Sequence, residues 1–446
     1  MKKILLTTLL AVLAGVTQLR ADTDIYITGS TAFRVNVIAA VQNMFSSITV
    51  GYADTAQVAG GTTDSYASGK NYVWTISGTP ITALTNITGT LTVHANFTGS
   101  VQGIKAVQNE FSTKFTFLDK SGTDATAHVI TNSSTIAFSD VFATSTAYPE
   151  PSGFGEDTVA IQPFVFVKSE SPTVSGITNI TWQEAKALIS LGSLPLSFWT
   201  QNGGSTNVYM INRTRDSGTR RTVLGEVDDK YAQPFPINIY YPSVMAFTNY
   251  NSTVTGTTNN VVGASLGNLV NNLQWGPGYV GGGDIKSELA IADVQNAAVS
   301  YLSFSDAKGI SGVNWNYVLS DNGNWPTLAG AGVHGQTTGT NDFTPILTGQ
   351  YSYWAEEVVD YPTASGSLNT ADQDVSLTQL GTGTTPGTFL GVLNYQSYGT
   401  NSVLLGSIER EIINSGTSAV GNTAIPIWQM KVNHNGIGGV IAPGHY

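Results

Sequence analysis

A cluster of arginines and small hydroxyl residues lies in the middle of this chain of 446 residues. Residues 206–211 (TNVYMI) predict a buried strand and residues 219–230 predict a helix, so the small residues fall at the helix start. Free backbone N–H groups, hydroxyls and the positive end of a helix dipole would gather there, which suits an oxyanion such as phosphate. The residues concerned are Arg213, Arg215, Ser217, Gly218, Thr219, Arg220 and Arg221. A serine that only caps the helix, with arginines on a solvated face, explains the same local pattern.

Two earlier stretches repeat this strand, loop and helix order. Residues 24–28 predict a strand, residues 29–33 (GSTAF) a loop, and residues 34–45 an amphipathic helix with Ser30 and Thr31 at its start. Residues 98–107 predict the start of a further helix, with Ser100 near its first turn. Such loops are common in α/β proteins, so each one alone is weak support for a binding site.

Asp140 follows a predicted strand, residues 135–140 (TIAFSD). Ligand sites of α/β proteins collect residues at the carboxyl ends of strands, which makes Asp140 a candidate site residue. An aspartate that only caps a turn remains the alternative.

The first 21 residues predict a secretory signal. They combine Lys2 and Lys3 with an apolar run over residues 4–16 and small residues near Ala21, after which we expect cleavage. A membrane anchor is the alternative, but the apolar run is too short to span a bilayer comfortably. Because the chain has no cysteine, a lipid-modified cysteine and disulfides are both excluded. We therefore expect an exported protein, either periplasmic or released outside the cell.

The net charge of -11 argues against partners that are themselves strongly anionic. Nucleic acid and anionic membranes are disfavoured by such an acidic surface. A small anion is still compatible with it, because a local group of N–H and hydroxyl donors can oppose the overall field.

Several further segments predict the organisation of the fold. Residues 157–168 predict a long buried strand that could cross between domains, and Thr181 with Glu184 forms a capping box for a helix that ends near Gly192. Residues 46–98 are rich in Gly, Thr and Ser, with strand patterns at 71–76 and 88–97. Further segments predict a strand at 297–305, a loop-rich region at 309–345, an apolar aromatic segment at 346–357 and a helix near 402–414.

In this order, the pieces resemble the phosphate-binding substrate receptors of ABC importers, within the type II periplasmic binding protein superfamily. The resemblance covers most of residues 24–360, and each piece alone is short. The matching pieces are residues 28–33 (TGSTAF), 99–105 (GSVQGIK), 136–140 (IAFSD), 159–167 (VAIQPFVFV), 180–184 (ITWQE), Arg213 with 217–220 (SGTR), 299–304 (VSYLSF) and 349–354 (GQYSYW).

The resemblance implies an α/β fold of two lobes joined by hinge crossovers, here with an enlarged β-rich insertion at about residues 46–98. Lobe one would comprise residues 22–162 plus 346–446, and lobe two residues 163–345. It also implies a monomer without a cofactor, which carries inorganic phosphate or a similar oxyanion to the membrane subunits of an ABC importer.

The resemblance further implies the site residues. Ser100 would donate a hydrogen bond, Asp140 would accept one from a protonated phosphate oxygen, and Arg213 would supply positive charge. A fully ionised sulfate would instead place its charge against the Asp140 carboxylate, which is unfavourable. The remaining donors would be Ser30, Thr31, Ala32, Phe33, Ser217, Gly218 and Thr219.

One position departs from the family pattern. An acidic residue commonly lies two positions after the arginine and orients it, but Arg215 occupies that position here and Asp216 follows. Either Asp216 serves from a reshaped turn, or the anion differs from phosphate.

Two other classes of function are an enzyme and an adhesion protein. An enzyme needs a nucleophile with a base or a metal cluster, but the histidines are scattered and no Gly-x-Ser-x-Gly surrounds Ser217, so we expect no catalytic residue and no metal. A secreted or surface adhesion protein on the same fold is the alternative, drawing on residues 46–98 and 309–345, which could instead be tolerated surface insertions. Sugar platforms in such a protein could use Trp74, Trp315, Trp325 and Trp354, although most tryptophans are core residues.

Overall fold

The fold is mixed α/β, with a large central sheet, in a computed structural model. The structure describes residues 22–53, 72–108, 114–119, 129–146, 148, 152–169, 174–201, 206–213, 216–227, 281–290, 297–308, 320–321, 343–364, 375–394, 424–425, 431–434 and 441–443.

The elements of the first part of the chain alternate between strands and short helices. They are β1 (Thr23–Gly29), α2 (Arg34–Gln42), β2 (Phe45–Ala53), β3 (Val73–Pro80), β4 (Leu91–Asn96), α3 (Ser100–Val107), β5 (Phe115–Leu118), β6 (Val129–Asn132), β7 (Ile136–Ser139) and β8 (Phe154–Lys168). The next group is β9 (Asn179–Ile180), α4 (Trp182–Leu191), β10 (Ser193–Pro195), β11 (Asn207–Met210), α5 (Gly218–Val227), α6 (Gly282–Ala290), β12 (Ala298–Ser303) and α7 (Phe304–Lys308). The last group is β13 (Ser320–Asp321), α8 (Thr344–Leu347), β14 (Trp354–Pro362), α9 (Leu377–Leu380), α10 (Phe389–Asn394), β15 (Val432–His434) and β16 (Ile441–Pro443).

Ten strands form the main sheet, in the order β10-β11-β12-β8-β14-β7-β1-β4-β3-β2. We call β14, β7, β1, β4, β3 and β2 the first sheet half, and β12, β11 and β10 the second sheet half. In the first half, β1 runs parallel to both β4 and β7, and in the second half β11 runs parallel to β12. The loops that follow these parallel strands are therefore the natural place for a ligand site in each half.

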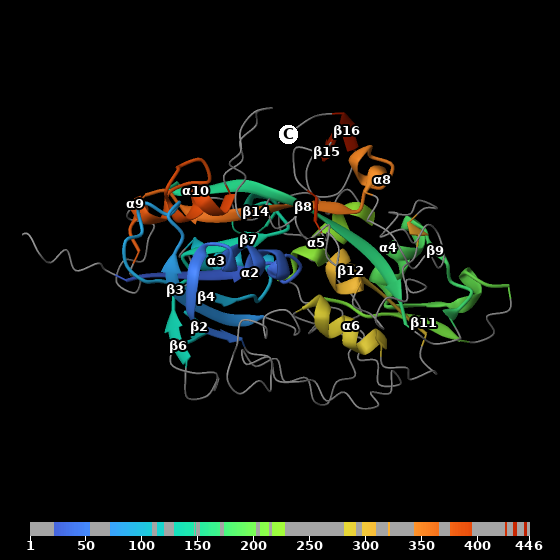
Figure 1. Ribbon diagram of the computed structural model, residues 1–446. Helices are drawn as coiled ribbons and strands as arrows, with labels where there is room; N and C mark the ends of the chain where they lie inside the picture. The colour runs from blue at the N-terminus through green and yellow to red at the C-terminus, as the bar shows by residue number, and fades with distance from the viewer. Residues whose placement is uncertain are drawn as a thin grey trace, which may run out of the picture.

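The long strand β8 belongs to both halves of the sheet. Its residues Phe154–Pro163 pair with β14, whereas Phe164–Lys168 pair with β12, both antiparallel. The partner changes at Pro163, which has no N–H to donate to the sheet. Figure 1 shows β8 lying beside β14 above the left group of strands and continuing into the right group, toward β12. The predicted long strand at residues 157–168 is thus confirmed and begins three residues earlier.

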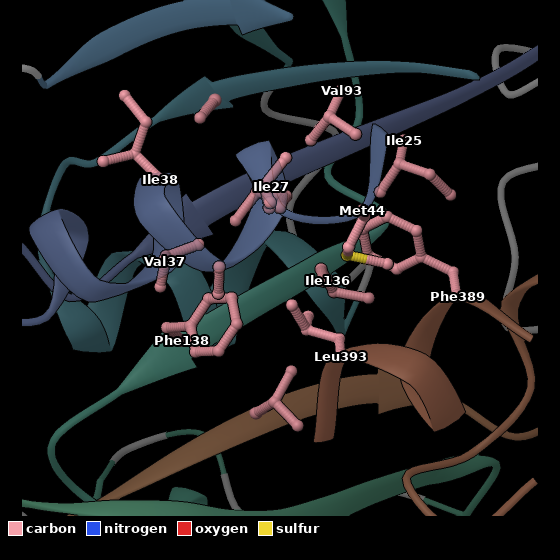
Figure 2. Close-up of a cluster of buried hydrophobic side chains, with 14 of the residues drawn as sticks. Ile25, Ile27, Val37, Ile38, Met44, Val93, Ile136, Phe138, Phe389 and Leu393 are labelled. Atoms are coloured by element: carbon pink, nitrogen blue, oxygen red, sulfur yellow. The ribbon is translucent and has the colours of Figure 1, made fainter. Parts of the chain in front are cut away.

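Two separate hydrophobic clusters pack on the two sheet halves. The first joins side chains from β1, α2, β4, β7 and α10, several of which are labelled in Figure 2. The second joins side chains from β8, α4, β11, α5 and β12. Trp74 and Trp354 are fully buried in these clusters, so they act as core residues and are not exposed for sugar binding.

The described part of residues 46–98 is not a surface decoration. Strands β3 and β4 are buried members of the first sheet half, and β4 lies directly beside β1. The expectation of a tolerated surface insertion is therefore wrong for these strands. The predicted helix after residue 34 ends at Gln42, and Phe45 begins β2 instead.

Other local expectations are confirmed. Thr181 and Glu184 form the capping box of α4, and Gly192 ends the helix in the left-handed conformation. Both are short-range effects, because a capping box links residues three positions apart and glycine adopts the left-handed conformation at little cost.

Some expectations lie outside the described residues, among them the signal at 1–21, the helix near 402–414, and Trp315 and Trp325. Among the residues that are described, no helix is long and apolar enough to cross a membrane.

A buried lysine holds the chain at the end of β8, where the second sheet half begins. Lys168 Nζ donates to the carbonyl oxygens of Val174, Ser175 and Ile177 at 2.5–3.3 Å. Burial lowers the pKa of Lys168 to about 8, so the ammonium form still dominates at pH 7. We predict that Lys168→Ala lowers the free energy of unfolding by about 2–3 kcal/mol, because buried carbonyl groups lose their donor.

Urea denaturation at pH 7 measures this loss. The matched control is Lys431→Ala, at an exposed lysine, which should change stability by less than about 0.5 kcal/mol. Equal losses in the two variants would contradict the role given to Lys168.

Candidate anion-binding site

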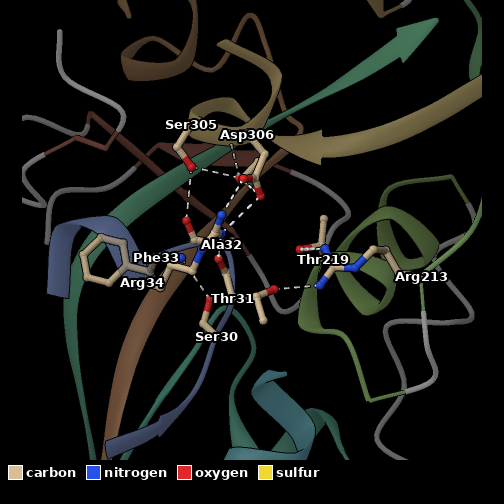
Figure 3. Close-up of polar contacts among 10 residues, drawn as sticks. Ser30, Thr31, Ala32, Phe33, Arg34, Arg213, Thr219, Ser305 and Asp306 are labelled. Atoms are coloured by element: carbon tan, nitrogen blue, oxygen red, sulfur yellow. Dashed lines mark hydrogen bonds and ion pairs between the residues drawn. The ribbon is translucent and has the colours of Figure 1, made fainter. Parts of the chain in front are cut away.

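A continuous chain of hydrogen bonds connects the two sheet halves through Arg213. Arg213 Nη2 donates to Thr31 Oγ1 at 2.8 Å, and Nη1 donates to Thr219 Oγ1 at 3.4 Å (Figure 3). Thr219 Oγ1 in turn donates to Asp140 Oδ2 at 3.1 Å, and Ser100 Oγ donates to Asp140 Oδ1. Five of the residues predicted from sequence therefore form one network, although they come from four separate loops and helix starts.

The topology explains why these distant residues meet. Thr31 follows β1, Ser100 follows β4 and Asp140 follows β7, so all three lie at the carboxyl ends of neighbouring parallel strands. Arg213 follows β11 in the second sheet half, close to its parallel strand β12. The network thus forms where the carboxyl ends of parallel strands from both halves face each other.

Asp140 combines deep burial with several donors. It is almost fully buried, and burial raises the pKa of its carboxyl group. The hydrogen bond from Ser100, the charge of Arg213 and the hydrogen bond from Thr219 oppose this rise. These donors stabilise the charged form, which is the form that can only accept hydrogen bonds.

Three helices direct their first turns toward this network. Helix α2 begins at Arg34, α3 at Ser100 and α5 at Gly218, next to Thr31, Asp140 and Thr219 respectively. Backbone N–H groups in a first helical turn have no acceptor within their own helix, and the helix dipole places partial positive charge there. This arrangement supplies donors and positive potential from both sheet halves.

Two glycines allow the two sheet halves to approach closely. A Cβ atom on Gly218 would lie 1.6 Å from Asp140 Oδ1 and 2.5 Å from Ser100 Oγ. Gly99 has a φ of +123°, and a Cβ atom there would lie 2.8 Å from the carbonyl oxygen of Asp216. Both contacts join α3 or β7 to the start of α5, so any side chain at either glycine would push the halves apart.

The other residues predicted for the site have smaller roles in the observed contacts. Ser217 Oγ accepts from the backbone N–H of Arg220 at 3.2 Å, which is the ordinary geometry of a helix cap. Ser30 Oγ accepts from the backbone N–H of Phe33 at 3.3 Å, and the Ala32 carbonyl oxygen accepts from Ser305 Oγ at 3.2 Å. These residues lie beside the network and shape its loops.

Asp216, which follows the position where the sequence departs from the family pattern, makes a defined contact. Lys105 Nζ lies 3.1 Å from Asp216 Oδ1, so this carboxylate forms an ion pair with α3 of the first sheet half. Arg215 lies outside the described residues. The backbone of Arg213 is held by a different residue, Arg220, whose Nη1 donates to the Arg213 carbonyl oxygen at 2.9 Å.

Sequence reasoning missed a second link between the halves. Arg34 Nη2 lies 2.9 Å from Asp306 Oδ1 in a buried ion pair (Figure 3). The Arg34 guanidinium also packs over the ring of Tyr72. Burial acts to raise the pKa of Asp306, but the charge and hydrogen bond of Arg34, together with the charges of Lys286 and Arg213, lower it below its ordinary value. Ser303 donates to Asp306 Oδ2 and accepts from the backbone N–H of Asp306. Among these contacts of Asp306, only those with Ser303 join residues close in sequence.

A buried glutamate was also missed. Glu357 in β14 lies with Oε2 3.4 Å from Ser30 Oγ, directly behind the first loop of the site. The pair Glu356 and Glu357, between Ala355 and Val358 in a largely apolar strand, was the available signal, because side chains of adjacent strand residues point to opposite faces.

Groupings of residues that would hold a metal are absent from the described part of the chain. His94, the buried histidine of β4, stacks on Tyr26 at 4.8 Å and places Nδ1 2.8 Å from the Leu118 carbonyl oxygen. These contacts give it a structural role.

No protein-family model and no curated protein matches the sequence. Solved structures with a similar fold include a phosphate-binding protein from Stenotrophomonas maltophilia, which is 11% identical over 91% of this chain and 90% of that chain, with a TM-score of 0.42. An ABC-type phosphate transport receptor from Vibrio cholerae is 13% identical over 77% and 88%, with a TM-score of 0.34. A human phosphate binding apolipoprotein is 12% identical over 76% and 81%, with a TM-score of 0.38.

The raised pKa of Asp140 predicts a pH-dependent contribution to stability. Between the unfolded-state pKa, about 3.9, and the higher folded-state pKa, the folded protein binds more protons than the unfolded chain. The free energy of unfolding of the wild type, relative to Asp140→Asn, should therefore fall as pH rises through this window. The slope cannot exceed about 1.4 kcal/mol per pH unit. Urea denaturation of both proteins from pH 4 upward measures it, and a difference that grows with pH would contradict the assignment.

The close approach at Gly218 predicts a specific packing defect. Gly218→Ala should lower the free energy of unfolding by about 1–3 kcal/mol, because Asp140 must move to admit the methyl group. In an Asp140→Ala background the same substitution should cost less, since the nearest clashing atom is gone. Thermal unfolding of the four proteins in this cycle measures the coupling, and strictly additive effects would refute the contact.

Proposed function

We propose that this protein is an exported solute-binding protein that captures phosphate or a related oxyanion between two lobes, for delivery to an ABC importer. It is a binding protein and not an enzyme in this proposal. The supporting observation is the buried network from Thr31 through Arg213 and Thr219 to Asp140, which brings positive charge, hydroxyl donors and helix starts together.

An oxyanion fits the chemistry of this network better than other small ligands. The guanidinium of Arg213 donates two N–H groups to hydroxyl oxygens and places its positive charge near Asp140. The Thr31 hydroxyl accepts from Arg213 and keeps its own proton for a ligand, and first-turn N–H groups can also donate. Ser100 and Thr219 donate their hydroxyl protons to Asp140, so they would donate to an anion only after turning from that carboxylate. Tetrahedral anions are bound by such sets in proteins, with Arg giving charge-assisted hydrogen bonds.

The carboxyl group of Asp140 favours phosphate among the oxyanions. Phosphate carries a proton at neutral pH, so one of its oxygens can donate to the Asp140 carboxylate. Sulfate has no proton to donate there, and its charge would meet the carboxylate without compensation. The site therefore selects by what it repels as well as by what it binds.

The proposed lobes follow from the strand that the two sheet halves share. Lobe one would contain residues 22–162 plus 346–446 and lobe two residues 163–345, with β8 and β14 as the crossovers. The separate hydrophobic clusters support a division into two lobes, although the second cluster also takes in Ile346, Tyr353 and Trp354 from the segment assigned to lobe one. Direct contacts such as Arg213 to Thr31 would then belong to the closed arrangement of the lobes.

Replacement of Arg213 tests the proposal directly. Arg213→Ala should weaken phosphate binding at least about tenfold, because hydrogen bonds to charged groups are worth about 1.5–3 kcal/mol. The matched control is Arg221→Ala, an arginine of α5 whose Nη2 donates to the Ser145 carbonyl oxygen away from the network. Its affinity should stay within about threefold of wild type. Calorimetric titration of ligand-stripped, refolded protein with phosphate measures both, and equal effects would refute the site.

Replacement of Asp140 tests the choice of anion. In separate titrations near neutral pH, the wild type should bind phosphate and show no detectable binding of sulfate. Asp140→Asn should bind phosphate more weakly and gain affinity for sulfate, because the repelling charge is removed. Sulfate binding by the wild type would overturn phosphate as the ligand, and silence of the refolded protein toward both anions would overturn the proposed function.

A further inference from the structure

Two buried carboxyl groups lie next to each other across neighbouring strands at the site. Val358 of β14 pairs with Ser139 of β7, and the strands are antiparallel. Glu357, which precedes Val358, is therefore brought beside Asp140, which follows Ser139. The register of β14 against β8 also shifts between Glu357 and Val358, an irregularity of the kind that redirects a side chain.

The surroundings of the two carboxyl groups differ. Asp140 accepts from Ser100 and Thr219 and feels the charge of Arg213. Glu357 is fully buried, its Oε2 atom lies 3.4 Å from Ser30 Oγ, and its Oε1 atom has no hydrogen-bond partner among the described residues. An ionised carboxylate needs several donors when it is taken out of water, and Glu357 lacks them.

The described elements that pack against β14 place no positively charged side chain in an ion pair with Glu357. From β7, Asp140 faces it and is itself acidic. On β8, which pairs with β14, Glu156 and Asp157 lie opposite Asp360 and Val359, farther along the strand. On α3, which also packs on β14, Lys105 forms its ion pair with Asp216. Burial first, and then the charge of Asp140, raise the pKa of Glu357 well above its ordinary value, opposed by the contact with Ser30.

We propose that Glu357 is kept as a neutral carboxylic acid that donates its proton to Ser30 Oγ and so directs the Ser30 hydroxyl toward the bound anion. Ser30 Oγ already accepts from the backbone N–H of Phe33. With a second hydrogen bond from Glu357, both acceptor positions of the hydroxyl are used, and its own proton remains to be donated. An ionised Glu357 would instead take the Ser30 proton, and the site would lose a donor.

Glu357 is a positioning residue in this account, because it acts on the ligand through Ser30. The inference rests on the proposed oxyanion site and assigns the two carboxyl groups opposite forms. Asp140 is the charged acceptor, and Glu357 is the uncharged donor. Environments that push the pKa values of neighbouring acids apart are a general way of giving such pairs different roles.

The protonation state of Glu357 is measured without any ligand. Protein labelled with ¹³C at the glutamate side-chain carboxyl is titrated by NMR, and the Glu357 signal is identified by its loss in Glu357→Gln. A signal at the shift of a protonated acid at pH 7 is expected. A signal at the shift of a carboxylate at pH 7 would overturn the inference, whatever the protein binds.

Phosphate titration of variants tests the link to Ser30. Glu357→Gln keeps a donor, so its Kd should stay within about threefold of wild type at pH 6, whereas Glu357→Leu should weaken binding about three- to tenfold. In a Ser30→Ala background, Glu357→Leu should have no further effect, because the hydroxyl it orients is absent. A full additional loss there would show a merely structural role and overturn the inference. Glu356→Gln, on the same strand beside Thr158, is the matched control and should bind as wild type.

The pH profile separates the two proposals. The ratio of the wild-type Kd to the Glu357→Gln Kd cancels the ionisation of phosphate itself. It should stay near one at acidic pH and rise as pH passes the raised pKa of Glu357, where the ionised acid repels the anion. Tighter binding by Glu357→Gln already at pH 6 would overturn the neutral acid and leave the proposed function standing. Silence of both proteins toward phosphate would overturn the proposed function, and the NMR titration would still decide the state of Glu357.

Discussion

The buried charge of Arg213 is the constraint on which the site depends. Only 1% of this residue is exposed, and a guanidinium removed from water needs partners for its N–H groups and a compensating charge. Thr31 and Thr219 accept from it, while Asp140 supplies the nearest favourable charge in the network. Because these partners come from both sheet halves, satisfying one arginine also holds the halves together.

The geometry of the site depends on the close approach of the two sheet halves as much as on its polar groups. Gly218 and Gly99 leave room for the backbone of one half against the side chains of the other. The ion pair of Arg34 with Asp306 spans the same boundary a short distance away. Because the hydroxyl groups of Ser100 and Thr219 already donate to Asp140, an anion bound there would have to redirect them, which costs part of the binding free energy.

Local chemistry was readable from the sequence, and long-range pairing was not. The capping box at Thr181, the strand that leads to Asp140 and the small residues before α5 depend on neighbours within a few positions. Strands at residues 71–76 and 88–97 were predicted, but their place inside the sheet was not, because β3 and β4 are buried on both faces although they contain polar residues as well as apolar ones. Neither Arg34 with Asp306 nor Glu357 with Ser30 could be foreseen, since each pair is separated by more than 270 residues.

The position of β14 also limits the order in which the sheet can be completed. All strands of the second sheet half, together with β8, have been synthesised by Ser303. The other strands of the first sheet half, from β1 to β7, are synthesised much earlier. Strand β14, which lies between β7 and β8, is the last strand of this sheet to be synthesised, at Trp354–Pro362. A chain that emerges from its N terminus therefore presents unpaired edges on β7 and on part of β8 until β14 arrives. Unpaired edges of this kind invite association with other chains, so the most aggregation-prone interval of biosynthesis precedes the insertion of this one strand.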